Sequence, residues 1–150
     1  MAISYNLDKI SYQIGMINCF VEMVAFGVKK LAISPPIDPE DLGIMTQVSK
    51  EISDGYKTKY YVENSLMITD IQSAEFTEGK NSILYYVDDS IINEYLSLKK
   101  RVDELTAKNV YAGVERREIS IRFGELLGYP EKVILSKVDG IDHSDPFVLY

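Results

Sequence analysis

The chain has 150 residues, a formal net charge of −7, 46% hydrophobic residues and one cysteine, Cys19. Its length predicts a single domain over residues 1–150, large enough to bury about 70% of its unfolded surface. One cysteine excludes an internal disulfide and a multi-cysteine metal site. The amino terminus lacks the basic-then-apolar order of a secretory signal, so we expect a cytoplasmic protein.

Charge and hydropathy also narrow the choice of partners. The basic residues between positions 99 and 132 are interspersed with acids, whereas nucleic-acid binding needs a concentrated basic face. The apolar stretch 14–28 contains Asn18 and Glu22 and is shorter than the roughly 20 residues of a membrane span. We therefore expect a core helix at 14–28, and neither nucleic acid nor membrane as a partner.

The first third of the chain predicts a helix, a short strand and a second helix. Residues 7–26 have helical spacing, and Gly27 suits the left-handed position that often follows a helix end. The sequence VKKLAIS at 28–34 is typical of a short strand, which the two following prolines stop. Asp38 then predicts the N-cap of a helix that we expect to end at Gly55.

Three segments rich in β-branched or aromatic residues follow. They are KYYVE at 59–63, LMITD at 66–70 and SILYYV at 82–87, and each predicts a strand. Together with 28–34 they predict a mixed sheet of about four strands. The stretch 71–81 is polar, has no firm periodicity and forms the longest connection inside this region.

The last third of the chain predicts helices. An amphipathic helix follows the acidic pair 88–89, because its apolar residues are spaced by four and three: Ile91, Tyr95, Leu98, Val102 and Leu105. A further helix is expected over 114–127, and a short one after it. The element order therefore predicts an α+β or α/β domain of two layers, with about four strands in a mixed sheet and about five helices.

The stretch RFGELLGYPEKV at 122–133 places Gly128, Tyr129 and Pro130 between the last two predicted helices. Gly128 stands where a C-cap glycine belongs, and Pro130 stands where a new helix begins. A helix joint explains all three residues. A loop that also offers Tyr129 to a ligand is the alternative interpretation.

The same stretch resembles a segment of an uncharacterised, mainly archaeal family of small proteins. In that family a Leu-Gly-Tyr-Pro joint is commonly followed by cysteines, whereas this chain has Glu131, Lys132 and Val133 there. The resemblance therefore implies no metal or redox role for these positions. What it implies is a domain of unknown function, with no established activity and no site residues to carry over.

Residue types that support nucleophilic catalysis are scarce. Such catalysis needs a nucleophile beside a proton acceptor, usually a histidine. The one histidine, His143, lies in a polar tail near the end of the chain, and Cys19 lies in an apolar helix where cysteines behave mostly as small hydrophobes. The sequence contains no phosphate-loop, dinucleotide-binding or zinc-protease motif, so we predict no cofactor.

Three carboxylates follow predicted strands. Asp70 ends one strand, and Asp88 and Asp89 end another. If these strands are antiparallel neighbours, Asp70 and Asp88 lie at opposite ends of the sheet and cannot share an ion. We therefore predict no metal site, and a helix cap as the role of the acidic pair.

A polar stripe follows one face of the first predicted helix and consists of Ser11, Gly15, Asn18 and Glu22. Its simplest interpretation is a solvated line on a helix that packs on its other sides. In the alternative interpretation, Asn18 and Glu22 point into a groove that binds a ligand.

A small-residue face follows a later predicted helix and consists of Gly113, Arg117, Ser120 and Gly124. Close helix packing explains it best. Arg117 in that face could instead hold a carboxylate or phosphate.

Paired tyrosines occur in two of the predicted strands, as Tyr60 with Tyr61 and Tyr85 with Tyr86. Neighbours in a strand face opposite sides of the sheet. If helices cover only one side, the outward tyrosines form an amphipathic patch that suits a partner chain, and we predict a homodimer. The patch could also receive another protein partner.

These observations favour a non-enzymatic binding or regulatory module that self-associates. The alternative is a small-molecule enzyme or ligand-binding protein with a polar cleft, which would use Asn18, Glu22, Asp70 and Arg117. The sequence leaves open whether the protein is an enzyme. A deep pocket with convergent polar groups would favour the alternative, and a flat apolar patch the first interpretation.

Overall fold

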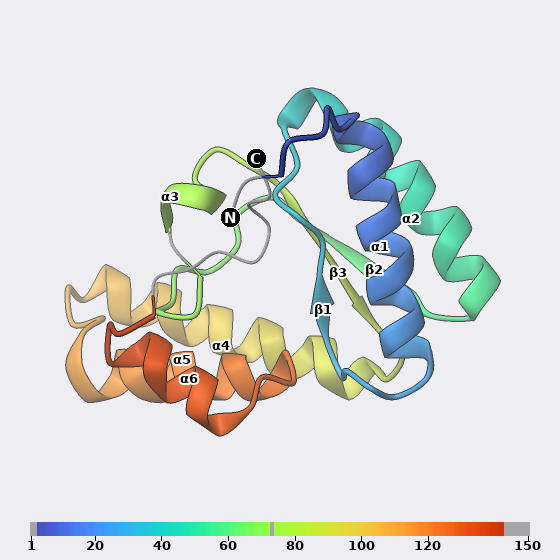
Figure 1. The fold of residues 1–150 in the computed structure, drawn as a ribbon. Helices are drawn as coiled ribbons and strands as arrows, with labels where there is room; N and C mark the ends of the chain where they lie inside the picture. Colours follow the sequence, from blue (N-terminus) through green and yellow to red (C-terminus); the bar gives the residue numbers. More distant parts are fainter. Residues whose placement is uncertain (1–2, 73, 143–150) are drawn as a thin grey trace.

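The computed structural model of the protein describes residues 3–72 and 74–142 (Figure 1). Its elements follow the chain in the order α1 (Lys9–Ala25), β1 (Ala32–Ile33), the 3-10 helix η1 (Pro39–Asp41), α2 (Leu42–Tyr56), β2 (Lys59–Glu63), α3 (Ala74–Thr77), β3 (Ser82–Tyr86), α4 (Asp89–Ala107), α5 (Gly113–Leu126) and α6 (Glu131–Val138). The predicted α+β class is confirmed.

The sheet has the strand order β1-β3-β2, and both neighbours of β3 are antiparallel to it. Tyr85 of β3 lies opposite Ala32 on one side and opposite Tyr60 on the other. Within the described residues the sheet thus has three antiparallel strands, instead of the mixed sheet of about four that we expected. β1 is short because Pro35 and Pro36, which have no N–H to donate to a ladder, follow it closely.

Helices pack on both faces of the sheet (Figure 1). Ile83 and Tyr85 belong to a core under α1 and α2, while Leu84 and Tyr86 belong to a second core under α4, α5 and α6. This alternation follows from the period of two in a strand. The predicted two-layer arrangement is therefore wrong, because the sheet lies between two layers of helices.

The second layer of helices also removes the predicted tyrosine patch. Tyr85 and Tyr86 are buried, and Tyr60 and Tyr61 are partly buried against the two cores. The sheet therefore offers no open tyrosine face to a partner chain. Self-association itself stays a prediction, which sedimentation equilibrium at micromolar concentration tests.

Residues 66–70 do not form the strand that their composition predicts. Their backbone bonds to side chains of α5 and of the loop before it: the Asp70 N–H donates to Ser120 Oγ at 2.9 Å, and the Ile68 carbonyl accepts from the Tyr111 hydroxyl at 2.5 Å. Because these side chains satisfy the backbone, the segment is held without a neighbouring strand.

Most of the predicted helix ends are confirmed. Gly27 follows α1 with φ +77°, and the Asp88 side chain caps α4. The predicted end of α2 at Gly55 is wrong, because the helix continues through Tyr56, which packs against the core under α1 and α2. Lys57 then takes the left-handed position with φ 58°.

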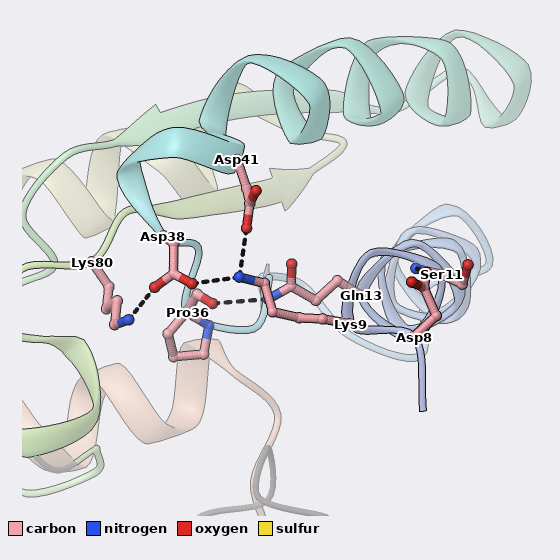
Figure 2. A network of polar contacts seen from close by, with 8 residues as sticks. All are labelled: Asp8, Lys9, Ser11, Gln13, Pro36, Asp38, Asp41 and Lys80. Atoms are coloured by element: carbon pink, nitrogen blue, oxygen red, sulfur yellow. Dashed lines mark hydrogen bonds and ion pairs between the residues drawn. The ribbon is translucent and has the colours of Figure 1, made fainter. Parts of the chain in front are cut away.

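Asp38 stands at the predicted N-cap position, before η1, but its side chain makes no cap hydrogen bond. Its carboxylate pairs instead with Lys80 and, at 2.5 Å, with Lys9 (Figure 2). Lys80 and Lys9 lower the pKa of Asp38, because two opposite charges favour its ionised form. Lys9 also pairs with Asp41 at 2.7 Å. The network ties the start of α1 to η1 and to the segment that enters β3.

The joint between α5 and α6 is confirmed as a C-cap, since Gly128 has φ +77°. The close packing predicted for the small-residue face is confirmed at Gly124, where a Cβ would lie 2.8 Å from Ile134 Cγ1 of α6, but not at Gly113, where a Cβ would meet nothing within 4 Å. The Leu31 N–H donates to the Leu126 carbonyl at 3.2 Å. The joint therefore lies beside the segment that enters β1.

Candidate functional site

Lys29 lies where the chain leaves α1 and turns toward β1. Gly27 allows the turn, and the Lys29 N–H donates to the Met23 carbonyl at 3.2 Å. Side chains alternate in direction as the chain enters β1, which places Lys29 on the side of Leu31 and Ile33. These two residues belong to the core under α4, α5 and α6. The Lys29 side chain consequently extends toward the α5–α6 joint.

A pocket of about 330 Å³ lies at this place, between α1, β1 and the joint. Its walls are mostly apolar, and its lining consists of Met16, Phe20, Lys29, Ile33, Gln72, Leu127 and Tyr129. Small-molecule sites occupy roughly 300–1,000 Å³ and combine apolar walls with a few polar groups. The pocket has the size and the composition of a site for a small ligand.

The Lys29 amine is the cation of the pocket. It lies 5.2 Å from the centroid of the Tyr129 ring and 6.0 Å from that of the Phe20 ring. Burial lowers the pKa of Lys29, and no carboxylate of the described residues offsets that effect. Two aromatic faces thus take the place of an acidic partner, which leaves the charge available to an anion.

The chemistry of the lining follows from these contacts. Met16, Phe20 and Leu127 supply apolar surface for the body of a ligand, and Gln72 supplies an amide. Lysine donates hydrogen bonds as a compact point charge and binds carboxylate or phosphate groups. The pocket can therefore hold a molecule that is apolar over most of its surface and anionic at one end.

The five residues that the sequence nominated do not gather in one place. Tyr129 lines the pocket. Asp70 pairs with Arg116 at 2.9 Å, and Arg117 pairs with Asp139 at 2.5 Å. Asn18 and Glu22 are both exposed on α1, as the solvated-stripe interpretation predicts. Asp70 and Arg117, which the sequence placed together in a ligand-binding cleft, therefore each form an ion pair with a different residue.

Two further sequence-based expectations concern Cys19 and His143. Cys19 is exposed, so the expectation of a buried cysteine is wrong. It lies on α1, whose core-facing positions are taken by the residues Gln13, Ile17, Val21 and Val24. His143 lies outside the described residues.

Lys29 is the functional candidate that sequence reasoning missed. The available signal was the alternation in VKKLAIS, which places Lys29 on the same side as Leu31 and Ile33, both core residues. The sequence does not show that a helix joint from the other end of the chain covers that side.

A second cluster of ionisable groups surrounds Glu63 at the end of β2. Glu63 is only 3% exposed and accepts hydrogen bonds from Tyr95 at 2.8 Å and from Lys99 at 2.6 Å. The Ser65 N–H donates to it as well, at 3.1 Å. Its carboxylate is satisfied by the protein itself, which makes a structural role the simplest explanation.

Neither a metal cluster nor a membrane span is found in the described part of the chain. No group of three or more potential metal ligands lies together in residues 3–72 and 74–142. Over the same residues, no helix has the length and hydropathy that crossing a membrane requires.

Comparison with protein-family models, with curated proteins and with solved structures found no match. The resemblance of 122–133 to an archaeal family stays a prediction.

Proposed function

We propose that the protein binds a small molecule with an apolar body and one anionic group in the pocket around Lys29. The observation that carries this proposal is the position of the Lys29 amine, which lies half-buried against two aromatic rings with no acidic partner among the described residues. A buried cation without a counter-charge is costly, and an anionic ligand reduces that cost.

The two parts of such a ligand contribute differently to affinity. Apolar surface that enters the pocket contributes about 25 cal/mol per Å² removed from water. A hydrogen bond to a charged amine contributes about 1.5–3 kcal/mol. The apolar walls therefore set the size of the ligand, and Lys29 sets the sign of its charge.

The composition of the lining favours binding over catalysis. General acid–base or nucleophilic mechanisms pair a nucleophile with a positioned proton acceptor, and none of the described residues that line the pocket is a carboxylate or a histidine. We therefore propose a non-enzymatic binding module, as the sequence suggested, whose binding site is the pocket and not a tyrosine patch on the sheet. Whether any ligand is transformed stays open.

Calorimetric titration with octanoate, octanol and octylamine tests the proposal, because the three probes share one chain and differ in their head group. We expect the native protein to bind octanoate about tenfold more tightly than octanol, a difference of about 1.4 kcal/mol, and octylamine most weakly. Lys29→Met should remove the preference for octanoate and leave the affinity for octanol, since its side chain keeps the apolar stem.

Lys30→Met is the matched control. Lys30 is adjacent in sequence and exposed, and does not line the pocket. Its replacement changes the net charge by the same amount and should leave all three affinities unchanged. Equal binding of octanoate in native protein and Lys29→Met, or no binding of any probe, contradicts the proposed function.

A further inference from the structure

The Lys29 amine has a second chemical capacity besides its charge. An amine in an apolar pocket loses its proton more readily than one in water, and only the neutral form is a nucleophile. Burial lowers the pKa of Lys29, which favours the neutral amine, and no carboxylate of the described residues counters this effect. Ion pairs hold many of the other lysines: Lys9, Lys50, Lys59, Lys80, Lys99, Lys100 and Lys137.

We propose that Lys29 forms a reversible imine with small apolar aldehydes that enter the pocket. This inference rests on the proposed function, because the same apolar walls must first hold the ligand. The walls are placed for it: the amine lies beside the Tyr129 and Phe20 rings, and Met16 and Leu127 line the same space. The ligand class is thus widened from apolar anions to apolar carbonyl compounds.

The bond changes in this reaction balance without any further reactant. The lone pair of Lys29 Nζ attacks the carbonyl carbon, and the carbonyl oxygen takes up a proton from the amine to give a carbinolamine. The C–O bond then breaks, the remaining nitrogen proton leaves with the hydroxyl group as water, and a C=N bond forms. Hydrolysis reverses the sequence, so the captured aldehyde is released unchanged.

Holding the aldehyde beside the amine raises their effective concentration, which exposed lysines lack. The pocket also limits the amount of water near the C=N bond, because its walls are mostly apolar. Both effects favour imine formation at Lys29 over the exposed lysines of the chain.

Trapping with octanal and cyanoborohydride tests the inference, because reduction converts the imine to a stable secondary amine, N-octyl-lysine. Peptide mass analysis then shows which lysine carries the octyl group. We expect Lys29 to be labelled about tenfold faster than exposed Lys30. Added octanoate should slow labelling of Lys29 and leave Lys30 unaffected, because it competes only for the pocket.

Lys29→Arg separates this inference from the proposed function. Arginine keeps the positive charge but is not a nucleophile at neutral pH, so this variant should bind octanoate and show no preferential label. If octanol and octanoate bind the native protein while octanal labels all lysines in proportion to exposure, the imine is rejected and the binding function stands. If none of the probes binds and Lys29 is unlabelled, both are rejected.

Discussion

The amine of Lys29 lies 5.2 Å from the centroid of the Tyr129 ring. Lys29 comes from the turn between α1 and β1, whereas Tyr129 comes from the joint between α5 and α6. The contact therefore connects the segment that follows α1 with the α5–α6 joint, on the side of the sheet that α4, α5 and α6 cover. It depends on Gly128, where the chain turns between the two helices. Gly128 also lies close to the Lys29 side chain, because a Cβ at Gly128 would be 3.9 Å from Lys29 Cγ.

Gly128→Val should lower the free energy of unfolding by about 1 kcal/mol or more, because β-branched residues resist a left-handed backbone. Gly128 has φ +77°. Urea unfolding measures the loss. Gly128→Asn is the control and should cost less, since asparagine tolerates this conformation. Equal stability of the valine variant and the native protein contradicts the C-cap assignment.

Replacement by alanine should have opposite effects on stability at Gly124 and at Gly15. A Cβ at Gly124 would lie 2.8 Å from Ile134 Cγ1 and 3.1 Å from Ile71 Cδ1, so Gly124→Ala should destabilise the protein by about 1–3 kcal/mol. Gly15 lies inside α1 with nothing within 4 Å of its Cβ position, so Gly15→Ala should stabilise by up to about 1 kcal/mol.

Thermal unfolding of both alanine variants shows directly whether each substitution lowers or raises the stability. Adding Ile134→Val to Gly124→Ala should recover part of the loss, because the Ile134 side chain lies nearest to the added Cβ. Destabilisation by alanine at both positions would contradict the difference in packing between α1 and the α5–α6 contact.

Lys99 and Lys100 test the importance of the Glu63 cluster. Lys99→Met leaves the buried Glu63 carboxylate without its cation, and we expect a loss of about 2 kcal/mol or more in urea unfolding. Lys100 pairs with Glu104 at 4.0 Å on the surface, and its side chain is 79% exposed. Lys100→Met should therefore change stability by less than about 0.5 kcal/mol. Equal effects would show that Glu63 does not need Lys99.

Alkaline pH should destabilise the protein through Tyr85 and Tyr95. Burial raises the pKa of both hydroxyls, and the charge of Glu63 raises that of Tyr95 further. A raised pKa in the folded state means that the stabilisation is complete below the ordinary value of about 10 and is lost as the pH rises above it.

Urea midpoints between about pH 8 and about pH 11 measure this loss. Tyr95→Phe should flatten the decline, since phenylalanine does not titrate, although it also removes a hydrogen bond to Glu63. The comparison therefore uses the slope with pH instead of the stability at one pH. An unchanged slope in both Tyr85→Phe and Tyr95→Phe contradicts the assignment.

Local patterns predict much of this fold. The spacing of apolar residues locates α1, α4 and α5, and Gly128 with Pro130 locates the last joint. These features depend on neighbours within a few residues, which the sequence displays directly. The α+β class follows from the order of such elements.

Long-range pairing explains what the sequence does not predict. Residues 66–70 have the composition of a strand, yet Ser120 and Tyr111 satisfy backbone groups there. Asp38 has the position of an N-cap, yet its carboxylate forms ion pairs with Lys9 and Lys80 and makes no cap hydrogen bond. Each of these contacts joins residues far apart in the chain, so the local spacing of residues does not predict it.

In the candidate site, too, local features could be predicted from the sequence and long-range contacts could not. Tyr129 could be nominated from its Gly-Tyr-Pro setting, because unusual loop chemistry is visible locally. Lys29 could not, since its significance comes from the two rings that flank its amine and from the pocket around it.

A crystal structure of the protein with octanoate tests the central claim most directly. The account predicts that the carboxylate lies within hydrogen-bonding distance of Lys29 Nζ and that the alkyl chain lies against Met16, Phe20 and Leu127, the apolar walls of the pocket. Octanoate bound elsewhere, or bound in the pocket with its carboxylate pointing away from Lys29, would contradict the account.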